Sequence, residues 1–421
     1  MKFATSKRER DTCVILDVVR RFGPMSRVDI HDLTRLRPGT ISMLVRDLLK
    51  RDSLREAGLS DNPTGRKQVL LRLNAESGYV LSIEFDADIV IAAILTLDAR
   101  VKHLIKEPTQ MSGGVNGLVG QLLGSAERVM YESRIDRSRL AGVAVADPGL
   151  VNSRDGISVA SSTIDFWKDV PLKKLFAERY SAPFLLESNT RARTVAERMI
   201  GAGHMAEDML YLDYGTGIGL GVVVEGRTLR GRSECAGEFG HTHVIEGGPP
   251  CKCGSFGCLE ALIGAPAIGA RVRTAMLDGG HSAALAMAGG VPDRITGYMV
   301  LEAARAGDKM CAAVAGDIER YLGLALANAI NLFNPELVVL DKRLELAGGE
   351  FLDGVARVAR RQALRQSTEG LEFRFARLGA DAGVLGAALL LINEVFEIPA
   401  LKLPKFMTEP RATRDLVAVK S

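Results

Sequence analysis

The sequence predicts an α/β protein in which a small winged helix-turn-helix domain precedes a larger body of two lobes. Two observations lead to this prediction. In the first eighty residues, apolar residues recur at helical spacing in three short segments, and a basic hairpin follows. From Gly78 onward, short apolar strands alternate with helical segments, which is typical of α/β domains, and 421 residues suffice for two lobes.

The composition is that of an ordinary water-soluble protein, with 47% hydrophobic and 25% charged residues. No apolar run reaches the ~20 residues that a membrane-spanning helix needs. The opening residues, MKFATSKRERD, lack the apolar segment of a secretory signal. We therefore expect a cytoplasmic protein without membrane insertion.

The net charge of +3 is unevenly distributed along the chain. The first 80 residues contain 16 Lys/Arg and 10 Asp/Glu, a net +6, which leaves +3 minus +6, or −3, for the remainder. A basic segment joined to a mildly acidic body favours a nucleic-acid-binding module at the N-terminus.

Three helices are expected in this basic segment. The first spans Arg10 to Arg21 and ends at Gly23-Pro24. Ser26 is a good N-cap for the second helix, with Asp29 as its capping-box partner. After a short turn, the third helix is expected to begin near Thr40. Two short helices joined by a tight turn predict a helix-turn-helix.

The exposed polar residues of this region are the predicted DNA contacts. Three side chains at the start of the third helix are expected in the major groove: Thr40, Ser42 and Arg46. Arg35 and Arg37 would lie near phosphates, and Arg66 and Lys67 at the tip of the wing would reach the minor groove. The alternative is a small helical domain with a solvated basic face.

Beyond Gly78, seven strands and five helices are expected. The strands are Val80–Phe85, Ile89–Leu97, Leu140–Val145, Phe184–Leu186, Met209–Leu212, Gly219–Val224 and Leu337–Leu340. The helices lie near 115–134, 171–180, 190–201, 299–306 and 311–333. Between two of the strands, the glycine-rich turn from Tyr214 to Gly221 could either bind a phosphate or simply form a tight hairpin.

A histidine and three cysteines, His241, Cys251, Cys253 and Cys258, fall within 18 residues. Three thiolates and one imidazole are the ligand set of a closed structural zinc site. A disulfide with a spare thiol is disfavoured in a reducing compartment. Glycines beside the cysteines allow the left-handed turns that such a loop needs. Because Glu238 and Glu260 bracket the loop, we expect a polar pocket braced by Zn²⁺.

The order of these motifs resembles the ROK family, which includes bacterial sugar kinases and sugar-responsive transcription repressors. The resemblance extends from about Arg10 to Leu391 and is most specific in the cysteine-rich segment. There the family pattern GExGH…CxCGxxGCLE is matched by Gly237–His241, Cys251–Gly254 and Gly257–Glu260. The resemblance implies a two-lobed body related to the actin-like ATPases, with a ribonuclease H-like fold. An N-terminal winged helix is similar to the repressor branch.

Three features of the family's kinases are altered here. The phosphate-binding turn Asp-x-Gly-Gly-Thr corresponds to Glu84–Asp88, which lacks both glycines and the threonine. The catalytic aspartate corresponds to Asn189, whose amide cannot accept a proton from a sugar hydroxyl. The Gly-Gly pair near the nucleotide corresponds to Asp341-Lys342. The comparison therefore implies that the chain is not an enzyme and has lost kinase activity.

The sugar-binding residues of the family are better kept. By resemblance, Glu238, His241 and Glu260 hydrogen-bond sugar hydroxyls, and one ring nitrogen of His241 binds zinc while the other faces the ligand. The resemblance also assigns Gly149, Ser162, Ser188 and Asn189 to the sugar site. Ser188 replaces the usual asparagine, so we expect a ligand other than a common hexose, or weaker binding. The alternative is that these residues form a polar network bracing the zinc loop.

We therefore interpret the chain as a sugar-responsive, DNA-binding transcriptional regulator, a repressor of carbohydrate uptake or catabolism genes. Its expected partners are operator DNA, a sugar or sugar derivative, and further copies of the chain in a homodimer or higher homo-oligomer. Two alternatives stay open: a ROK sugar kinase with a DNA-binding arm, and a repressor controlled by a protein partner such as a sugar transporter.

The expected domain boundaries follow from the same interpretation of the sequence. The winged helix spans 1–77, and the N-terminal lobe spans 78–190 with a returning helix at about 381–397. The C-terminal lobe, with the zinc loop, spans 191–380. A flexible tail is expected over 398–421.

Overall fold

The computed structural model describes residues 7–61 and 67–396. The chain forms two compact units. Of the described residues, the first unit contains 7–61, 67–79, 96–100 and 392–396, and the second contains 80–95 and 101–391. The expected wing tip, including Arg66, and the expected tail lie outside the described residues.

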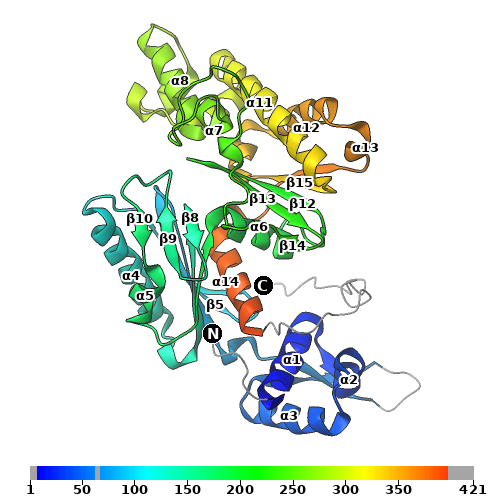
Figure 1. The fold of residues 1–421 in the computed structure, drawn as a ribbon. Coiled ribbons are helices and arrows are strands. Elements are labelled where there is room, and N and C mark those ends of the chain that lie inside the picture. Colours follow the sequence, from blue (N-terminus) through cyan, green and yellow to red (C-terminus); the bar gives the residue numbers. More distant parts are fainter. Residues whose placement is uncertain (1–6, 62–66, 397–421) are drawn as a thin grey trace. The chain divides into compact units, whose positions relative to one another are not determined.

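The first unit is built from three helices and a small sheet (Figure 1). In chain order its elements are α1 (Lys7–Phe22), β1 (Met25–Ser26), α2 (Arg27–Thr34), α3 (Pro38–Lys50), β2 (Leu54–Leu59) and β3 (Val69–Leu73). The strands have the order β1-β3-β2. The three helices bury their apolar faces together with Leu54 and Leu71 of the sheet. This is the arrangement of a winged helix-turn-helix.

The helix starts in this unit follow from capping chemistry. The Ser26 hydroxyl accepts from the Asp29 backbone N–H at 3.2 Å, and the Asp29 carboxylate accepts from the Ser26 N–H at 2.8 Å. The predicted capping box is therefore confirmed. Helix α3 begins at Pro38, two residues before the expected Thr40. The expectation was wrong because proline, which lacks an N–H, fits the first helical position.

The second unit contains two five-stranded sheets and a smaller sheet of three strands. The first sheet has the order β11-β7-β4-β5-β6 and the second β14-β13-β12-β15-β16. The strands of the first sheet are β4 (Tyr79–Phe85), β5 (Ile89–Thr96), β6 (Val101–Pro108), β7 (Leu140–Asp147) and β11 (Phe184–Ser188). Those of the second are β12 (Met209–Tyr214), β13 (Ile218–Val224), β14 (Arg227–Thr228), β15 (Leu337–Leu340) and β16 (Glu372–Phe375). The small sheet contains β8 (Leu150–Asn152), β9 (Ile157–Ala160) and β10 (Lys168–Val170).

Helices cover both large sheets (Figure 1). The helices that follow the first unit in the chain are α4 (Gly114–Ser133), α5 (Leu172–Ala177), α6 (Asn189–Ile200), α7 (Leu259–Ile263), α8 (Ala265–Leu277), α9 (Ala283–Met287), α10 (Gly297–Arg305), α11 (Lys309–Phe333), α12 (Gly349–Gln362), α13 (Arg365–Thr368) and α14 (Ala382–Phe396). The largest core packs α8, α10, α11 and α12 against one face of the second sheet. Helix α6 contacts β11 of the first sheet and β12 and β13 of the second. Its first turn therefore lies where the two sheets approach each other.

The predicted α/β class and all seven predicted strands and five predicted helices are confirmed, with differences of a few residues at their ends. Helix α14 corresponds to the helix expected near 381–397. Several elements beyond Gly78 had no counterpart in the prediction: strands β6, β8, β9, β10, β14 and β16, and helices α7, α8, α9, α12 and α13. Strand β6 is an edge strand with a partly exposed face, so Lys102, Lys106 and Glu107 interrupt its apolar pattern.

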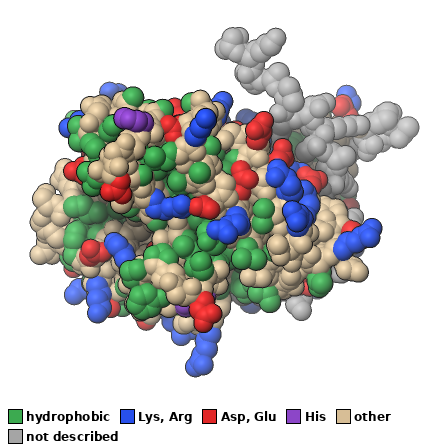
Figure 2. Space-filling view, turned by 90° about the horizontal axis from the view of Figure 1, so that it is seen from above, with side chains coloured by type: hydrophobic (Ala, Val, Ile, Leu, Met, Phe, Trp, Pro, Cys, Tyr) green, Lys and Arg blue, Asp and Glu red, His purple; other side chains and the backbone are tan. Residues whose placement is uncertain are grey.

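The surface shown in Figure 2 carries basic, acidic and hydrophobic side chains interspersed with one another. Among the described residues, no helix is long and apolar enough to cross a membrane.

Candidate functional site

The histidine and three cysteines singled out in the sequence converge in the structure. The possible ligand atoms of His241, Cys251, Cys253 and Cys258 all lie within 4.8 Å of one another. Nδ1 of His241 is 3.5 Å from Sγ of Cys251, and the Sγ atoms of Cys253 and Cys258 are 3.7 Å apart. These four side chains could hold a metal ion.

The geometry fits zinc. In a tetrahedral site with Zn–S bonds of about 2.3 Å and a Zn–N bond of about 2.0 Å, neighbouring ligand atoms lie roughly 3.5–3.8 Å apart. The observed 3.5 and 3.7 Å match these separations. All six cysteines of the chain are free thiols, so no disulfide competes for the three sulfurs.

The loop that carries these ligands depends on one glycine in particular. Gly257 has φ +70°, and a Cβ atom there would lie 1.9 Å from the carbonyl oxygen of Ile245. A side chain at this position is therefore excluded both by backbone conformation and by space. The next residue, Cys258, is the N-cap of α7, and this places Glu260 in the first turn of that helix.

A cavity of about 430 Å³ lies beside this loop. Its walls come from the end of β7, the start of α6, the turn between β12 and β13, and the cysteine-rich loop. The volume is within the range of small-molecule sites. All seven residues predicted for a sugar site line this one cavity: Gly149, Ser162, Ser188, Asn189, Glu238, His241 and Glu260. Their role in binding stays a prediction.

His241 joins the two sites. Its Nδ1 faces Cys251, whereas its Nε2 lies 3.9 Å from Oε2 of Glu238. A metal ion bound through Nδ1 would fix the ring and its tautomer and would leave Nε2 toward the cavity. On the other side, Oε2 of Glu260 accepts from the Ile218 backbone N–H at 3.0 Å, which orients this carboxylate.

Some of these residues also have structural roles. The Ser188 hydroxyl caps α6 by accepting from the Arg191 N–H. The Asn189 Nδ2 donates to the Phe85 carbonyl at 2.8 Å, whereas the buried Oδ1 has no partner among the described residues. A Cβ at Gly149 would lie 2.1 Å from the Ala160 carbonyl oxygen. Ser188 and Gly149 therefore have local structural roles, but these contacts do not involve the zinc loop.

Two cavity carboxyls have raised pKa values. Burial raises the pKa of Asp147 to about 6, although hydrogen bonds from Ser158, the Gly149 N–H and Trp167 oppose the shift. Burial also raises the pKa of Glu238, and the neighbouring Arg191 and His241 oppose this shift. Acids whose pKa values approach neutrality are common in functional clefts.

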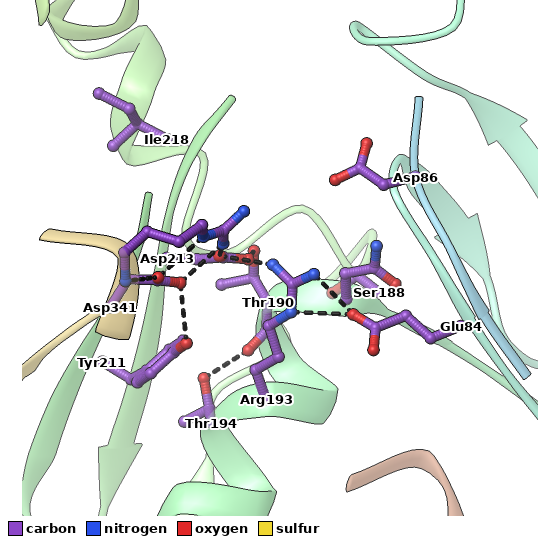
Figure 3. A network of polar contacts seen from close by, with 12 residues as sticks. Glu84, Asp86, Ser188, Thr190, Arg193, Thr194, Tyr211, Asp213, Ile218 and Asp341 are labelled. Atoms are coloured by element: carbon purple, nitrogen blue, oxygen red, sulfur yellow. Dashed lines mark hydrogen bonds and ion pairs between the residues drawn. The ribbon is translucent and has the colours of Figure 1, made fainter. Parts of the chain in front are cut away.

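Next to the cavity, buried acids and arginines connect the two sheets (Figure 3). Arg193 on α6 pairs with Glu84 on β4 at 2.6 Å and with Asp213 on β12 at 2.7 Å. Arg343, in the 3₁₀ helix Lys342–Ala347 after β15, pairs with Asp213 at 2.8 Å and with Asp341 at 2.7 Å. We call these five residues the acid–arginine cluster. Burial opposes ionisation of Asp341, but the charge and hydrogen bonds of Arg343 hold its pKa well below the usual range.

The glycine-rich turn forms a hairpin. Strands β12 and β13 pair in antiparallel fashion from Met209↔Val223 to Tyr214↔Ile218. Of the two predictions for this turn, a phosphate-binding turn or a tight hairpin, the hairpin describes the local structure. The turn also lines the cavity with Gly215, Thr216 and Gly217.

In the first unit, the predicted DNA contacts are mostly exposed. Arg35, Arg37, Ser42, Arg46 and Lys67 are exposed, and Thr40 is half-buried. Arg35 ends α2 in a left-handed conformation with φ +58°, and Arg37 is the N-cap of α3. The two arginines therefore flank the turn between the helices, and Ser42 and Arg46 lie on α3. Contact with DNA stays a prediction.

A sequence profile of the ROK family matches residues 92–394. The chain belongs to the ROK family. This confirms the predicted family, and a ROK fold accounts for the two sheets with the cavity between them.

Relatives within the ROK family include both regulators and kinases. The xylose repressor of Caldicellulosiruptor bescii is 24% identical over 377 residues, which cover 89% of this chain and 93% of that protein. A crystal structure of a ROK family transcriptional regulator, a homolog of the E. coli MLC protein, has 26% identity and a TM-score of 0.79 and covers 93% of this chain and 97% of its own. The glucokinase of Halalkalibacterium halodurans is 33% identical over 300 residues, or 71% of this chain and 90% of that protein. The matches to regulators thus include more of this chain than the match to the kinase.

Several residues at the site were missed by the sequence analysis. Arg191, Arg193, Asp213 and Arg343 all line the cavity. A signal existed for two of them. Asp213 is a lone acid in the apolar strand MLYLDY, and Arg193 is a charged residue within a helix that is buried over most of its length. A charge in a buried element needs a partner, but the partner is far away in the chain.

Proposed function

We propose that this ROK protein is a sugar-responsive, DNA-binding transcriptional regulator that represses genes of carbohydrate uptake or catabolism. A sugar or sugar derivative binds in the cavity against Glu238, His241 and Glu260. Binding favours one arrangement of the body over another, and thereby changes the affinity of the winged helices for operator DNA.

One observation carries this proposal: the chain combines a winged helix-turn-helix with a cavity lined by the residues predicted for sugar. Relatives that match about nine-tenths of the chain are named xylose repressor and DNA-binding transcriptional repressor. The exposed Arg35, Arg37 and Arg46 supply the positive charge that DNA binding needs.

The proposal includes a structural Zn²⁺ held by His241, Cys251, Cys253 and Cys258, whose separations support this ion. The ion would hold the loop and the His241 ring in place. We also propose that the active form is a homodimer, because winged helices of this kind bind paired half-sites.

We further propose that kinase activity is lost. Asn189 stands where the family's catalytic base is expected, and an amide cannot accept the sugar proton. Its Nδ2 is already bonded to the Phe85 carbonyl, which supports a structural use of this side chain.

The test is a fluorescence anisotropy titration of the full chain at physiological salt, with DNA from upstream of its own gene and with random DNA of equal length. We expect a clear preference for the upstream DNA and a change of affinity when an effector sugar is added. Equal affinity for both DNAs would reject the regulator.

A second candidate is a sugar kinase with a DNA-binding arm, which the 33% identity to a glucokinase favours. It predicts sugar-dependent release of ADP from ATP that disappears in Glu238→Ala. The regulator predicts no ADP above a protein-free control with any sugar of the same panel.

A further inference from the structure

The cavity wall formed by the β12–β13 turn is covered by an arginine whose charge is already neutralised. Arg343 bonds both oxygens of Asp341, from Nε at 2.8 Å and from Nη2 at 2.7 Å, and its Nη2 also lies 2.8 Å from Asp213. A Cβ atom placed on Gly215 would come within 2.6 Å of Nη1 of Arg343. The guanidinium therefore lies directly on the glycine-rich turn.

Two N–H groups at this turn are also occupied. The Gly215 N–H donates to the Gly217 carbonyl at 2.9 Å, and the Ile218 N–H donates to Glu260 at 3.0 Å. A glycine-rich turn binds phosphate when several of its N–H groups point at the ligand together. Here two of them are used internally, and a side chain covers the approach at Gly215.

The other two arginines of the cavity are neutralised as well. Arg193 bonds Glu84 and Asp213, and Arg191 bonds Glu187 at 2.6 Å. One nitrogen of Arg191, Nη2, has no partner among the described residues, but it is buried and closed to solvent. No arginine of the cavity thus presents a free charge to an incoming anion.

Acids of the cavity, in contrast, remain uncompensated. If each arginine is assigned one acid outside the cavity lining (Glu187, Glu84 and Asp341), then the five acids of the lining are left over: Asp86, Asp147, Asp213, Glu238 and Glu260. In the hydrogen bonds between described residues, Asp86 accepts from the Ala87 N–H and the Thr163 hydroxyl, which are uncharged donors. A phosphate or carboxylate in the cavity would meet repulsion without an opposing cation.

We propose that Arg343, held by Asp213 and Asp341, closes the phosphate side of the cavity, so that the cavity accepts uncharged polyhydroxylated ligands and rejects nucleotides and phosphorylated sugars. This inference rests on the proposed function, because it specifies the effector of the same cavity. The acid–arginine cluster takes the space and the charge that a phosphate group would need.

The test compares neutral and phosphorylated members of matched pairs by isothermal titration calorimetry on the full chain. The pairs are D-glucose with D-glucose 6-phosphate, and N-acetyl-D-glucosamine with its 6-phosphate; ATP is titrated alone. We expect at least one neutral sugar to bind at least about tenfold more tightly than its phosphate, a difference of about 1.4 kcal/mol, and we expect no binding of ATP. Equal or tighter binding of a phosphorylated sugar, or binding of ATP, would overturn the inference while leaving a sugar-responsive regulator intact.

A gain-of-binding variant tests the role of Arg343 itself. Asp213→Asn/Asp341→Asn keeps the size of both side chains but frees Arg343 from its acids. We expect it to bind ATP or a phosphorylated sugar measurably, with an affinity that falls as salt is raised. If the double variant does not fold, Asp341→Asn alone is used for the same measurement. The matched control is Asp317→Asn, because Asp317 forms an exposed pair with Arg271.

Two outcomes distinguish the role of Arg343 from the proposed response to sugar. A folded variant that still binds no phosphorylated ligand would overturn the role of Arg343. Absence of binding by every sugar, neutral or phosphorylated, would overturn both the inference and the proposed sugar response, whereas selective DNA binding would be unaffected.

Discussion

Arg193 donates two hydrogen bonds to a single carboxylate oxygen of Glu84, from Nε at 2.9 Å and from Nη2 at 2.6 Å. The two residues are 109 positions apart in the chain, and both are buried. The other oxygen of Glu84 accepts from the backbone N–H of Val384 in α14 at 3.1 Å. The ion pair of Glu84 with Arg193, drawn in Figure 3, therefore connects β4 of the first sheet to α6, and the hydrogen bond from Val384 adds α14.

Arg193→Met is expected to destabilise the protein by roughly 3–5 kcal/mol, because it leaves the buried carboxylate of Glu84 without its arginine and leaves Asp213 paired with Arg343 alone. The free energy of unfolding from chemical denaturation measures this. Arg271→Met, which removes an exposed pair with Asp317, should cost less than about 1 kcal/mol. Equal effects of the two substitutions would show that the buried pair contributes no more to the free energy of unfolding than the exposed pair.

Cys253→Ser is expected to lower the zinc content of the purified protein from about one ion per chain to near zero, because a tetrahedral site needs all four ligands. Elemental analysis measures the content, and thermal unfolding with a chelator measures the coupling to stability. Cys235→Ser is the control, since Cys235 is exposed and lies outside the cluster. Zinc retained in Cys253→Ser would remove this residue from the ligand set.

Two glycines of the loop separate backbone strain from steric exclusion. Both have positive φ, +89° at Gly254 and +70° at Gly257, but only at Gly257 does a Cβ meet other atoms, with the Ile245 oxygen at 1.9 Å. Gly254→Ala should therefore cost about 1 kcal/mol. Gly257→Ala should cost distinctly more and should reduce zinc content. Similar melting temperatures for the two variants would contradict the close approach of residue 257 to the Ile245 oxygen.

The raised pKa of Asp147 predicts that the stability of the protein depends on pH. Burial raises its pKa from 3.8 to about 6, so the folded state holds the proton more tightly than the unfolded state. The stabilising contribution of the protonated Asp147 to the free energy of unfolding is fully present below pH ~4. It is lost as the pH rises through about 6, and the total loss is roughly 3 kcal/mol. The melting temperature of the wild type relative to Asp147→Asn should therefore fall between pH 4 and pH 7. A constant difference across this range would contradict the raised pKa.

Arg46 provides the test of the winged helix. If α3 enters the major groove, Arg46→Ala should weaken binding to the upstream DNA by about 1–3 kcal/mol. Arg365→Ala is a suitable control, because Arg365 is exposed on the body and pairs there with Glu369. Unchanged DNA affinity in Arg46→Ala would remove this residue from the predicted contacts.

Local features of the fold were predictable because their causes are local. The capping box at Ser26 and Asp29 depends on residues three apart, and the strand pattern of 209–214 depends on its own apolar residues. The cysteine cluster was predictable for the same reason, since its four ligands fall within 18 residues. The start of α3 was misplaced because the turn residues before Thr40 include a proline that also suits a first helical turn.

By itself, the sequence determined the α/β class, the winged helix at the N-terminus and the convergence of His241 with three cysteines. The tertiary structure decided what surrounds that loop. Only folding brings Glu84, Arg193, Asp213 and Arg343 together from four separate elements. No spacing rule links residues so far apart, because their proximity results from how two sheets pack about α6, and a buried charge reveals its partner only after that packing is known.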